Sequence, residues 1–289
     1  MRQQRATALG FGAVLLWSLL AVLTVMTAPI PPFQLTAMSF AIGGLLGLVW
    51  IAVTGDLGAL RKISWKIYLF GTAGLFGYHF FYFSALRLAP PAEAGLIAYL
   101  WPLLIVLFSG LLPGERLRRG HVAGAVTGFA GAGLLVAGGA GASLGLDAPL
   151  GYALAILCAL TWSGYSVISR RLGSTPTSSI SVFCLATAGL SALAHLAFET
   201  PVWPDDPVTW LAVVGLGAGP VGLAFFIWDI GVKRGDIQLL GVASYAAPVL
   251  STFVLVAVGI APMTWVLLFS SVLITFGAWL AARASRTPG

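Results

Sequence analysis

Long apolar segments recur along this chain and limit its fold more than any other feature. Each approaches the roughly 20 mostly apolar residues with which an α-helix crosses the hydrocarbon of a bilayer. We place ten of them at Thr7–Met26, Phe33–Val53, Trp65–Arg87, Ala92–Leu112, His121–Val136, Leu150–Arg171, Ser178–Phe198, Val208–Val232, Gln238–Gly259 and Met263–Arg283. The sequence therefore predicts an all-α membrane protein with ten transmembrane helices. Transmembrane β-strands would instead alternate over about ten residues.

The composition points to lipid as the surrounding solvent. Charged residues are 8% and apolar residues 59% of the 289, whereas soluble domains hold about 25% charged residues. The first apolar run is longer than the roughly 7–15 residues of a secretory signal core, so we expect a retained helix. Cys158 and Cys184 lie in apolar segments without a thiol–histidine cluster nearby. We therefore predict no disulfide framework, no metal site and no cofactor.

The basic residues fix the expected orientation, because Lys and Arg stay on the cytoplasmic side. With the N-terminus inside, 14 of the 15 basic residues fall in inner segments, and Arg87 alone falls outside. The expected outer segments hold the acids Glu93, Asp147, Glu199, Asp205 and Asp206. This pattern predicts an even number of spans with both termini cytoplasmic. It also argues against a nucleic-acid partner, since the positive charges act as topology signals.

The two halves of the chain resemble each other. Three motifs recur at offsets of 145 or 146 residues: Trp17-Ser18 and Trp162-Ser163, Tyr99–Pro102 and Tyr245–Pro248, Phe80-Phe81 and Phe225-Phe226. Arg87, after the third span, has its counterpart in Lys233, after the eighth. We expect one repeat in residues 1–140 and a second in residues 148–286, with five spans each. Because five is odd, the second copy would be inverted, which is typical of transporters.

Several motifs carry a family resemblance by their order and spacing. They are the aligned Trp-Ser pairs, the Phe80–Leu88 segment running into Ala92-x-Ala94, the helices with Pro102 and Pro248, and Gly114-Glu115-Arg116-Leu117. Together they resemble the EamA branch of the drug/metabolite transporter superfamily over nearly the whole chain. One departure is that Ile260-Ala261 stands where the first half has Gly114-Glu115.

The aromatic third and fourth spans are most similar to the YddG-type amino-acid exporters within that family. This resemblance implies a ten-helix basket around a central cavity. It also implies export of amino acids, aromatic ones among them, across the bacterial inner membrane. The bilayer and a small-molecule substrate are then the expected partners. The oligomeric state stays open, a monomer included.

Polar and aromatic residues at membrane depth are the candidates for substrate binding, because their burial there is costly. Tyr78 and Tyr82 share a helix face, and His79 lies one position round from Tyr78. Aromatic walls can stack a planar side chain and hold an ammonium group. The aromatic candidates are Trp17, Tyr78, His79, Tyr82, Tyr99, Trp101, Trp162, Phe225 and Trp228. The alternatives are anchoring at the membrane interface and, for Trp17 and Trp162, plain packing.

Three serines and two prolines complete the predicted site. Ser18, Ser163 and Ser244 could bind a carboxylate. Pro102 and Pro248 each remove one intrahelical hydrogen bond and kink their helices. They could act as hinges or line a substrate path, although membrane helices also simply tolerate proline.

Asp229 lies near the cytoplasmic end of its expected span, four residues before Lys233. We favour a structural Asp–Lys pair over a proton-coupling carboxylate. The first span carries no acid, whereas related four-helix multidrug exporters carry their coupling glutamate there. The energy source therefore stays open.

Export of amino acids by alternating access is the leading functional hypothesis. Export of lipophilic cations or other small metabolites is the alternative within transport. A membrane-embedded enzyme is a remote third, because the sequence lacks HExxH and a metal-binding acid cluster. We therefore expect a transporter and no enzyme.

Overall fold

The computed structural model describes residues 1–54, 57–140 and 148–286. All of the regular secondary structure within these ranges is helical. Asp147, expected in an outer segment, lies outside these ranges. The helices are α1 (Gln3–Trp17), α2 (Leu20–Met26), α3 (Pro32–Thr54), α4 (Leu57–Leu60), α5 (Trp65–Leu88), α6 (Pro91–Ala98), α7 (Trp101–Ser109), α8 (Arg119–Ala140), α9 (Pro149–Arg171), α10 (Ser179–Phe198), α11 (Pro207–Ala218), the π-helical turn η1 (Gly219–Leu223), α12 (Ala224–Arg234), α13 (Ile237–Ala243), α14 (Ala246–Ala257) and α15 (Trp265–Arg286).

Nine stretches of the described chain are long and apolar enough to cross a membrane. They match nine of the ten expected spans. The remaining one, Trp65–Arg87, folds as the 24-residue helix α5 but is not among the nine. Lys66, His79 and three tyrosines lower the mean hydropathy of α5. A multi-pass membrane protein is thus confirmed, while the count of ten remains a prediction.

Three of the expected spans are each interrupted by one tight turn. The turns lie between α1 and α2, α6 and α7, and α13 and α14, and in each an N–H group bonds to the carbonyl three residues back instead of four. Two of them are explained by proline. In a continuous helix, Pro102 and Pro248 would clash with the carbonyls four residues earlier, at Ala98, the last residue of α6, and at Ser244, which follows α13.

Close helix contacts are made at glycines. A methyl group added at Gly124 of α8 would lie 2.5 Å from the carbonyl oxygen of Gly277 on α15. The glycine face formed by Gly124 and Gly128 therefore packs within the chain, against α15 and Tyr245. In the same way, a methyl at Gly231 of α12 would lie 2.5 Å from the Cα of Gly10 on α1. Small residues of this kind let membrane helices approach closely.

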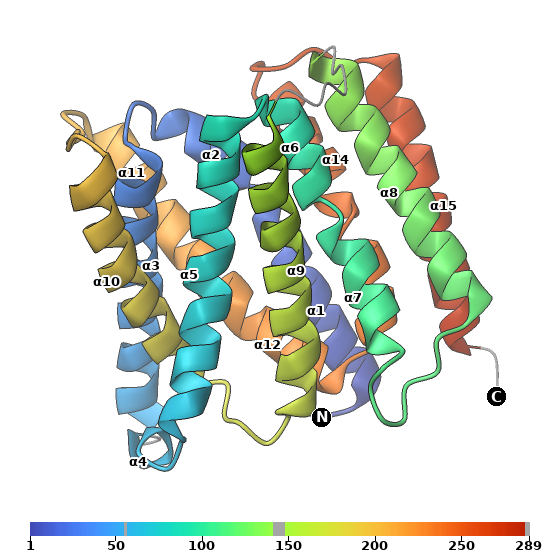
Figure 1. Ribbon diagram of the computed structural model, residues 1–289, viewed down its shortest axis with the longest axis horizontal. Coiled ribbons are helices and arrows are strands. Elements are labelled where there is room, and N and C mark those ends of the chain that lie inside the picture. The colour runs from blue at the N-terminus through green and yellow to red at the C-terminus, as the bar shows by residue number, and fades with distance from the viewer. Residues whose placement is uncertain (55–56, 141–147, 287–289) are drawn as a thin grey trace.

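The helices that pack along each other come from different halves of the chain. α8 lies beside α15 at one edge of the bundle, and α3 lies beside α10 near the other (Figure 1). α1 packs on α12, and α5 packs on α9. The largest apolar core lies between these layers and includes four tryptophans.

The helix α1 begins, and α15 ends, at the same end of the bundle (Figure 1). We call this end the N/C face and the opposite end the far face. Common ends are what an even number of crossings requires.

Candidate functional site

Four tryptophans from four different helices meet at the centre of the bundle. Trp17 closes α1, Trp101 opens α7, and Trp162 and Trp228 lie within α9 and α12. Their ring centroids are 5.0 Å apart for Trp17 and Trp228, and 5.9 Å apart for Trp17 and Trp162. All four are at most 9% exposed. We refer to these residues as the tryptophan cluster. All four were predicted to bind substrate, and the fold brings them together.

Hydrogen bonds orient two of these indoles. The Trp17 Nε1–H donates to the carbonyl of Pro220 over 3.1 Å, and the Trp228 Nε1–H donates to the Ser166 hydroxyl over 3.2 Å. Pro220 belongs to η1, where the helix widens to a π-turn. The π-turn and the end of α1 thus support each other.

Phe225 and His79 adjoin the cluster on the side of α3. Phe225 packs on Trp162 at 5.6 Å and on Phe40 at 5.4 Å. His79 lies edge-on to Phe40 at 4.9 Å, and its Nδ1 donates to the carbonyl of Leu75. Phe40 was not predicted. An apolar ring in a mostly apolar segment gives no signal of a binding role.

Tyr78, Tyr82 and Tyr99 are only half-buried. The rings of Tyr78 and Tyr82 stack in parallel, 6.1 Å apart, as their spacing predicted. Tyr78 also contacts Trp162 at 5.5 Å, which places this pair of phenols beside the tryptophan cluster. The three phenols and His79 therefore offer polar atoms next to a wall of rings.

The three candidate serines face their own helices. The hydroxyls of Ser18, Ser163 and Ser244 donate to the carbonyls of Leu15, Ala159 and Leu240, respectively. Ser163 and Ser244 are fully buried. In this conformation their protons are engaged, so a role in binding carboxylate stays a prediction.

The repeat-related tyrosines of the two halves have different surroundings. Tyr245 is fully buried, and its hydroxyl accepts a hydrogen bond from the N–H of Leu103 over 3.1 Å. Leu103 lies in the first turn of α7, where the helix itself supplies no acceptor. Tyr245 thus caps the helix that begins after Tyr99.

Two ion pairs hold the N/C face together. Asp229 pairs with Lys233 at 2.9 Å, and Thr177 donates to the same carboxylate oxygen at 2.7 Å. Arg170 pairs with Glu115 of the segment between α7 and α8, and bonds to two carbonyls, one in the last turn of α12 and one just after it. The expected pairing of Asp229 with Lys233 is present.

A carboxylate at the far face joins three helices. Glu199 accepts from the backbone N–H groups of Phe33 and Gln34 at the start of α3, and pairs with Arg87 and His195. Arg87 also lies 5.4 Å above the ring of Phe33. These contacts give a structural reason for the one basic residue that departs from the charge pattern. The contacts of Glu199 were not predicted, because in the sequence it cannot be distinguished from an ordinary loop acid.

The acids Glu93 and Asp206 occupy structural positions at the same face, whereas Asp205 is exposed. Glu93 is buried and accepts a hydrogen bond from Tyr152. Asp206 caps α11, and hydrogen bonds from the Thr209 hydroxyl and backbone N–H lower the pKa of its carboxyl. Within the described ranges, no group of three or more His, Cys, Asp or Glu residues could hold a metal ion.

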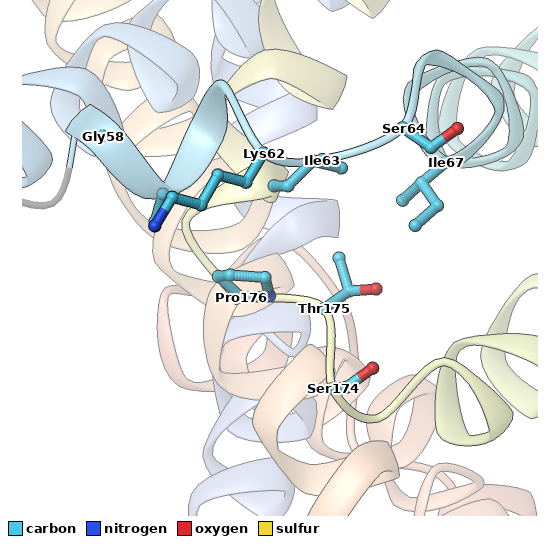
Figure 2. Close-up of a pocket in the computed structure, with 9 residues that line it drawn as sticks. Gly58, Lys62, Ile63, Ser64, Ile67, Ser174, Thr175 and Pro176 are labelled. Carbon is cyan, nitrogen blue, oxygen red and sulfur yellow. The ribbon is translucent and has the colours of Figure 1, made fainter.

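A cavity of about 690 Å³ opens at the N/C face, between the corner joining α4 to α5 and the loop joining α9 to α10. Figure 2 shows Lys62, Ile63, Ser64 and Ile67 along one wall and the segment Ser174–Pro176 along the other. The centre of the bundle, in contrast, is filled by packed rings. The expected central cavity therefore stays a prediction.

Known proteins resemble this chain over its full length. A curated protein of Ancylobacter novellus, named aromatic amino acid exporter YddG, is 55% identical over 99% of this chain and 100% of its own length. Its namesake in Salmonella typhimurium is 26% identical over 98% of this chain and 99% of its own length. A solved crystal structure with 54% identity superposes at a TM-score of 0.94, covering 99% of this chain and 100% of the other.

A family profile matches both halves of the sequence. The profile of the EamA-like transporter family aligns with residues 4–137 and again with residues 149–283. These two segments hold all four members of the tryptophan cluster. The protein therefore belongs to the EamA-like transporter family.

Proposed function

We propose that this protein exports amino acids, aromatic and other neutral ones, across the bacterial inner membrane by alternating access. The observation that carries the proposal is the 55% identity, over the full length, to a protein named aromatic amino acid exporter. The tryptophan cluster supports it, because rings from four helices form a surface that suits an aromatic side chain. The half-buried Tyr78, Tyr82, Tyr99 and His79 supply hydrogen-bonding groups beside that surface.

The proposed substrate site lies between the tryptophan cluster and these polar side chains. Phe225 completes its wall. Ser18, Ser163 and Ser244 are included as carboxylate partners that become available when their helices move. Pro102 and Pro248 are proposed hinges, since each stands next to an interruption of its helix.

The proposed architecture has ten spans in two inverted repeats of five, with both termini in the cytoplasm. Support comes from the helix pairs, because α8 beside α15 and α3 beside α10 each join equivalent spans of the two halves. The two segments matched by the family profile give the same division. α5 would be the third span, bordered by α9 and α10 inside the bundle.

Counterflow in proteoliposomes tests the proposed function. Vesicles loaded with unlabelled phenylalanine should accumulate labelled phenylalanine, and a mixed amino-acid panel with and without a pH gradient should show range and coupling. Tyr78→Ala, His79→Ala and Trp101→Ala should each lower the rate while the protein still inserts. The matched control is Trp265→Ala, because Trp265 is 77% exposed at a helix end.

The outcomes separate the rival functions. Unchanged flux in all three variants contradicts the site. Transport of quaternary amines without transport of amino acids favours the export of lipophilic cations. Turnover of a substrate that depends on an added metal ion would instead favour a membrane-embedded enzyme.

A further inference from the structure

On α12, the pair formed by Asp229 and Lys233 follows the tryptophan cluster in the direction of the N/C face. Asp229 follows Trp228 in the sequence, and Lys233 is one helical turn further toward the N/C face, a rise of about 6 Å. Along the axis of α12, both charges therefore lie between Trp228 and the N/C face. Both side chains are nearly inaccessible, with 1% exposure for Asp229 and 5% for Lys233.

One oxygen of Asp229 is unused. Its Oδ2 accepts from both the Thr177 hydroxyl and the Lys233 ammonium. Among the described residues, no donor reaches its Oδ1, which is buried. A buried acceptor without a partner destabilises the fold by about 1–3 kcal/mol, and by more for a charged group. A purely structural ion pair at this depth would be expected to use both oxygens.

The other ion pairs of the described chain leave no buried carboxylate oxygen without a partner. Both oxygens of Glu199 are taken up by backbone N–H groups, Arg87 and His195. Glu115 pairs with Arg170 through one oxygen, but its side chain is 18% exposed, so water can reach the other. Among the ion pairs of the described chain, the Asp229–Lys233 pair is therefore the one with a buried oxygen left for another donor.

The pair also ties down a wall of the cavity at the N/C face. Lys233 donates to the carbonyl of Thr175, and Asp229 accepts from Thr177. Thr175 belongs to the segment Ser174–Pro176, which faces Ile63 and Ser64 across that cavity (Figure 2). If another molecule replaced Thr175 and Thr177 as partners of the ion pair, the segment Ser174–Pro176 would lose these two attachments.

We propose that Asp229 and Lys233 recognise the charged backbone of the amino acid as it enters from the N/C face. The α-ammonium of the substrate binds the free Oδ1 of Asp229, and its α-carboxylate binds Lys233 in place of the Thr175 carbonyl. An ammonium brings three donors and a carboxylate only acceptors, so a zwitterion complements both partners at once. The inference rests on the proposed function and adds a reason for selectivity toward zwitterions.

Counterflow with three matched compounds tests this proposal: L-phenylalanine, phenethylamine, which lacks the carboxylate, and 3-phenylpropionate, which lacks the ammonium. The wild-type protein should prefer phenylalanine over each of the others by about tenfold or more, the size expected for one lost charge-assisted hydrogen bond. Asp229→Asn should bring the ratio of phenylalanine to 3-phenylpropionate toward one. Lys233→Met should bring the ratio of phenylalanine to phenethylamine toward one.

Glu115→Gln is the control, because it breaks the other ion pair at the N/C face and should leave both ratios unchanged. Equal slowing of all three compounds by Asp229→Asn and Lys233→Met would overturn the proposal. It would indicate that the pair only stabilises the fold at the N/C face. If Asp229→Asn does not fold, Lys233→Met and the charge-preserving Lys233→Arg carry the comparison. Absence of phenylalanine transport by the wild type would instead contradict the proposed function itself.

Discussion

Replacing Tyr245 with phenylalanine removes one oxygen from the interior and leaves the ring in place. The ring packs on Phe129 with 6.2 Å between centroids and lies against Gly128. The hydroxyl that is lost accepts the N–H of Leu103 over 3.1 Å. Since Leu103 is in the first turn of α7, that N–H finds no acceptor in its own helix. Water is scarce at this depth and cannot replace the tyrosine.

The size of the effect follows from the orphaned donor. An unsatisfied buried N–H costs about 1–3 kcal/mol. Side-chain hydrogen bonds in membrane interiors average only about 0.6 kcal/mol, because the unfolded chain in the membrane also finds partners. We therefore expect Tyr245→Phe to lower the free energy of unfolding by about 1–2 kcal/mol. Equilibrium unfolding in mixed micelles, followed by circular dichroism, measures this difference.

The repeat partner Tyr99 supplies the matched control. It is half-buried, and its hydroxyl does not cap a helix. Tyr99→Phe should change stability by less than about 0.5 kcal/mol, as surface substitutions do, but should slow phenylalanine counterflow. A loss below about 0.5 kcal/mol for Tyr245→Phe would refute the capping role. Equal losses for the two variants would refute the difference between the repeats.

Three further substitutions test the supports around the centre. Glu199→Ala should destabilise the protein in thermal unfolding by about 1–3 kcal/mol for each orphaned group, because the buried N–H groups of Phe33 and Gln34 lose their acceptor, whereas exposed Asp205→Ala should leave the midpoint unchanged. Gly124→Val should reduce the yield of folded protein on size-exclusion chromatography, because even a methyl would meet the Gly277 carbonyl at 2.5 Å; full yield would contradict this contact. Trp17→Phe should cost about 0.5–1.5 kcal/mol by removing the hydrogen bond from its indole N–H to the Pro220 carbonyl in η1, and an unchanged unfolding curve would argue against that bond.

Apolar patterning sufficed to predict most of the helices, because length and hydrophobicity alone decide whether a segment can span lipid. The interruption of α1 after Trp17 was not predicted, since no proline marks it. There the Ser18 hydroxyl bonds back to its own helix at Leu15. Such a bond depends on a rotamer, which the residue order does not determine.

The candidate site was predictable only in its composition. Aromatic residues in the middle of apolar segments pointed to Trp17 and Trp162, and the fold brings them to 5.9 Å. The difference between Tyr99 and Tyr245 was not predictable, because the two motifs are alike and only the neighbour supplied by the other half separates them. The role of Glu199 was not predictable for the same reason. Its partners Arg87 and Phe33 are more than one hundred residues away in the sequence.

The tryptophan cluster also gives this protein a built-in optical signal. Indoles whose centroids are 5.0–6.3 Å apart are close enough for their electronic transitions to couple. Coupled transitions give paired bands of opposite sign in the near-ultraviolet circular dichroism spectrum. Trp265, exposed at a helix end, lies outside this group and contributes mainly to fluorescence. The circular dichroism of the unlabelled protein in a bilayer can therefore show whether the tryptophan cluster is packed or separated. Its fluorescence reports instead on the exposed helix end.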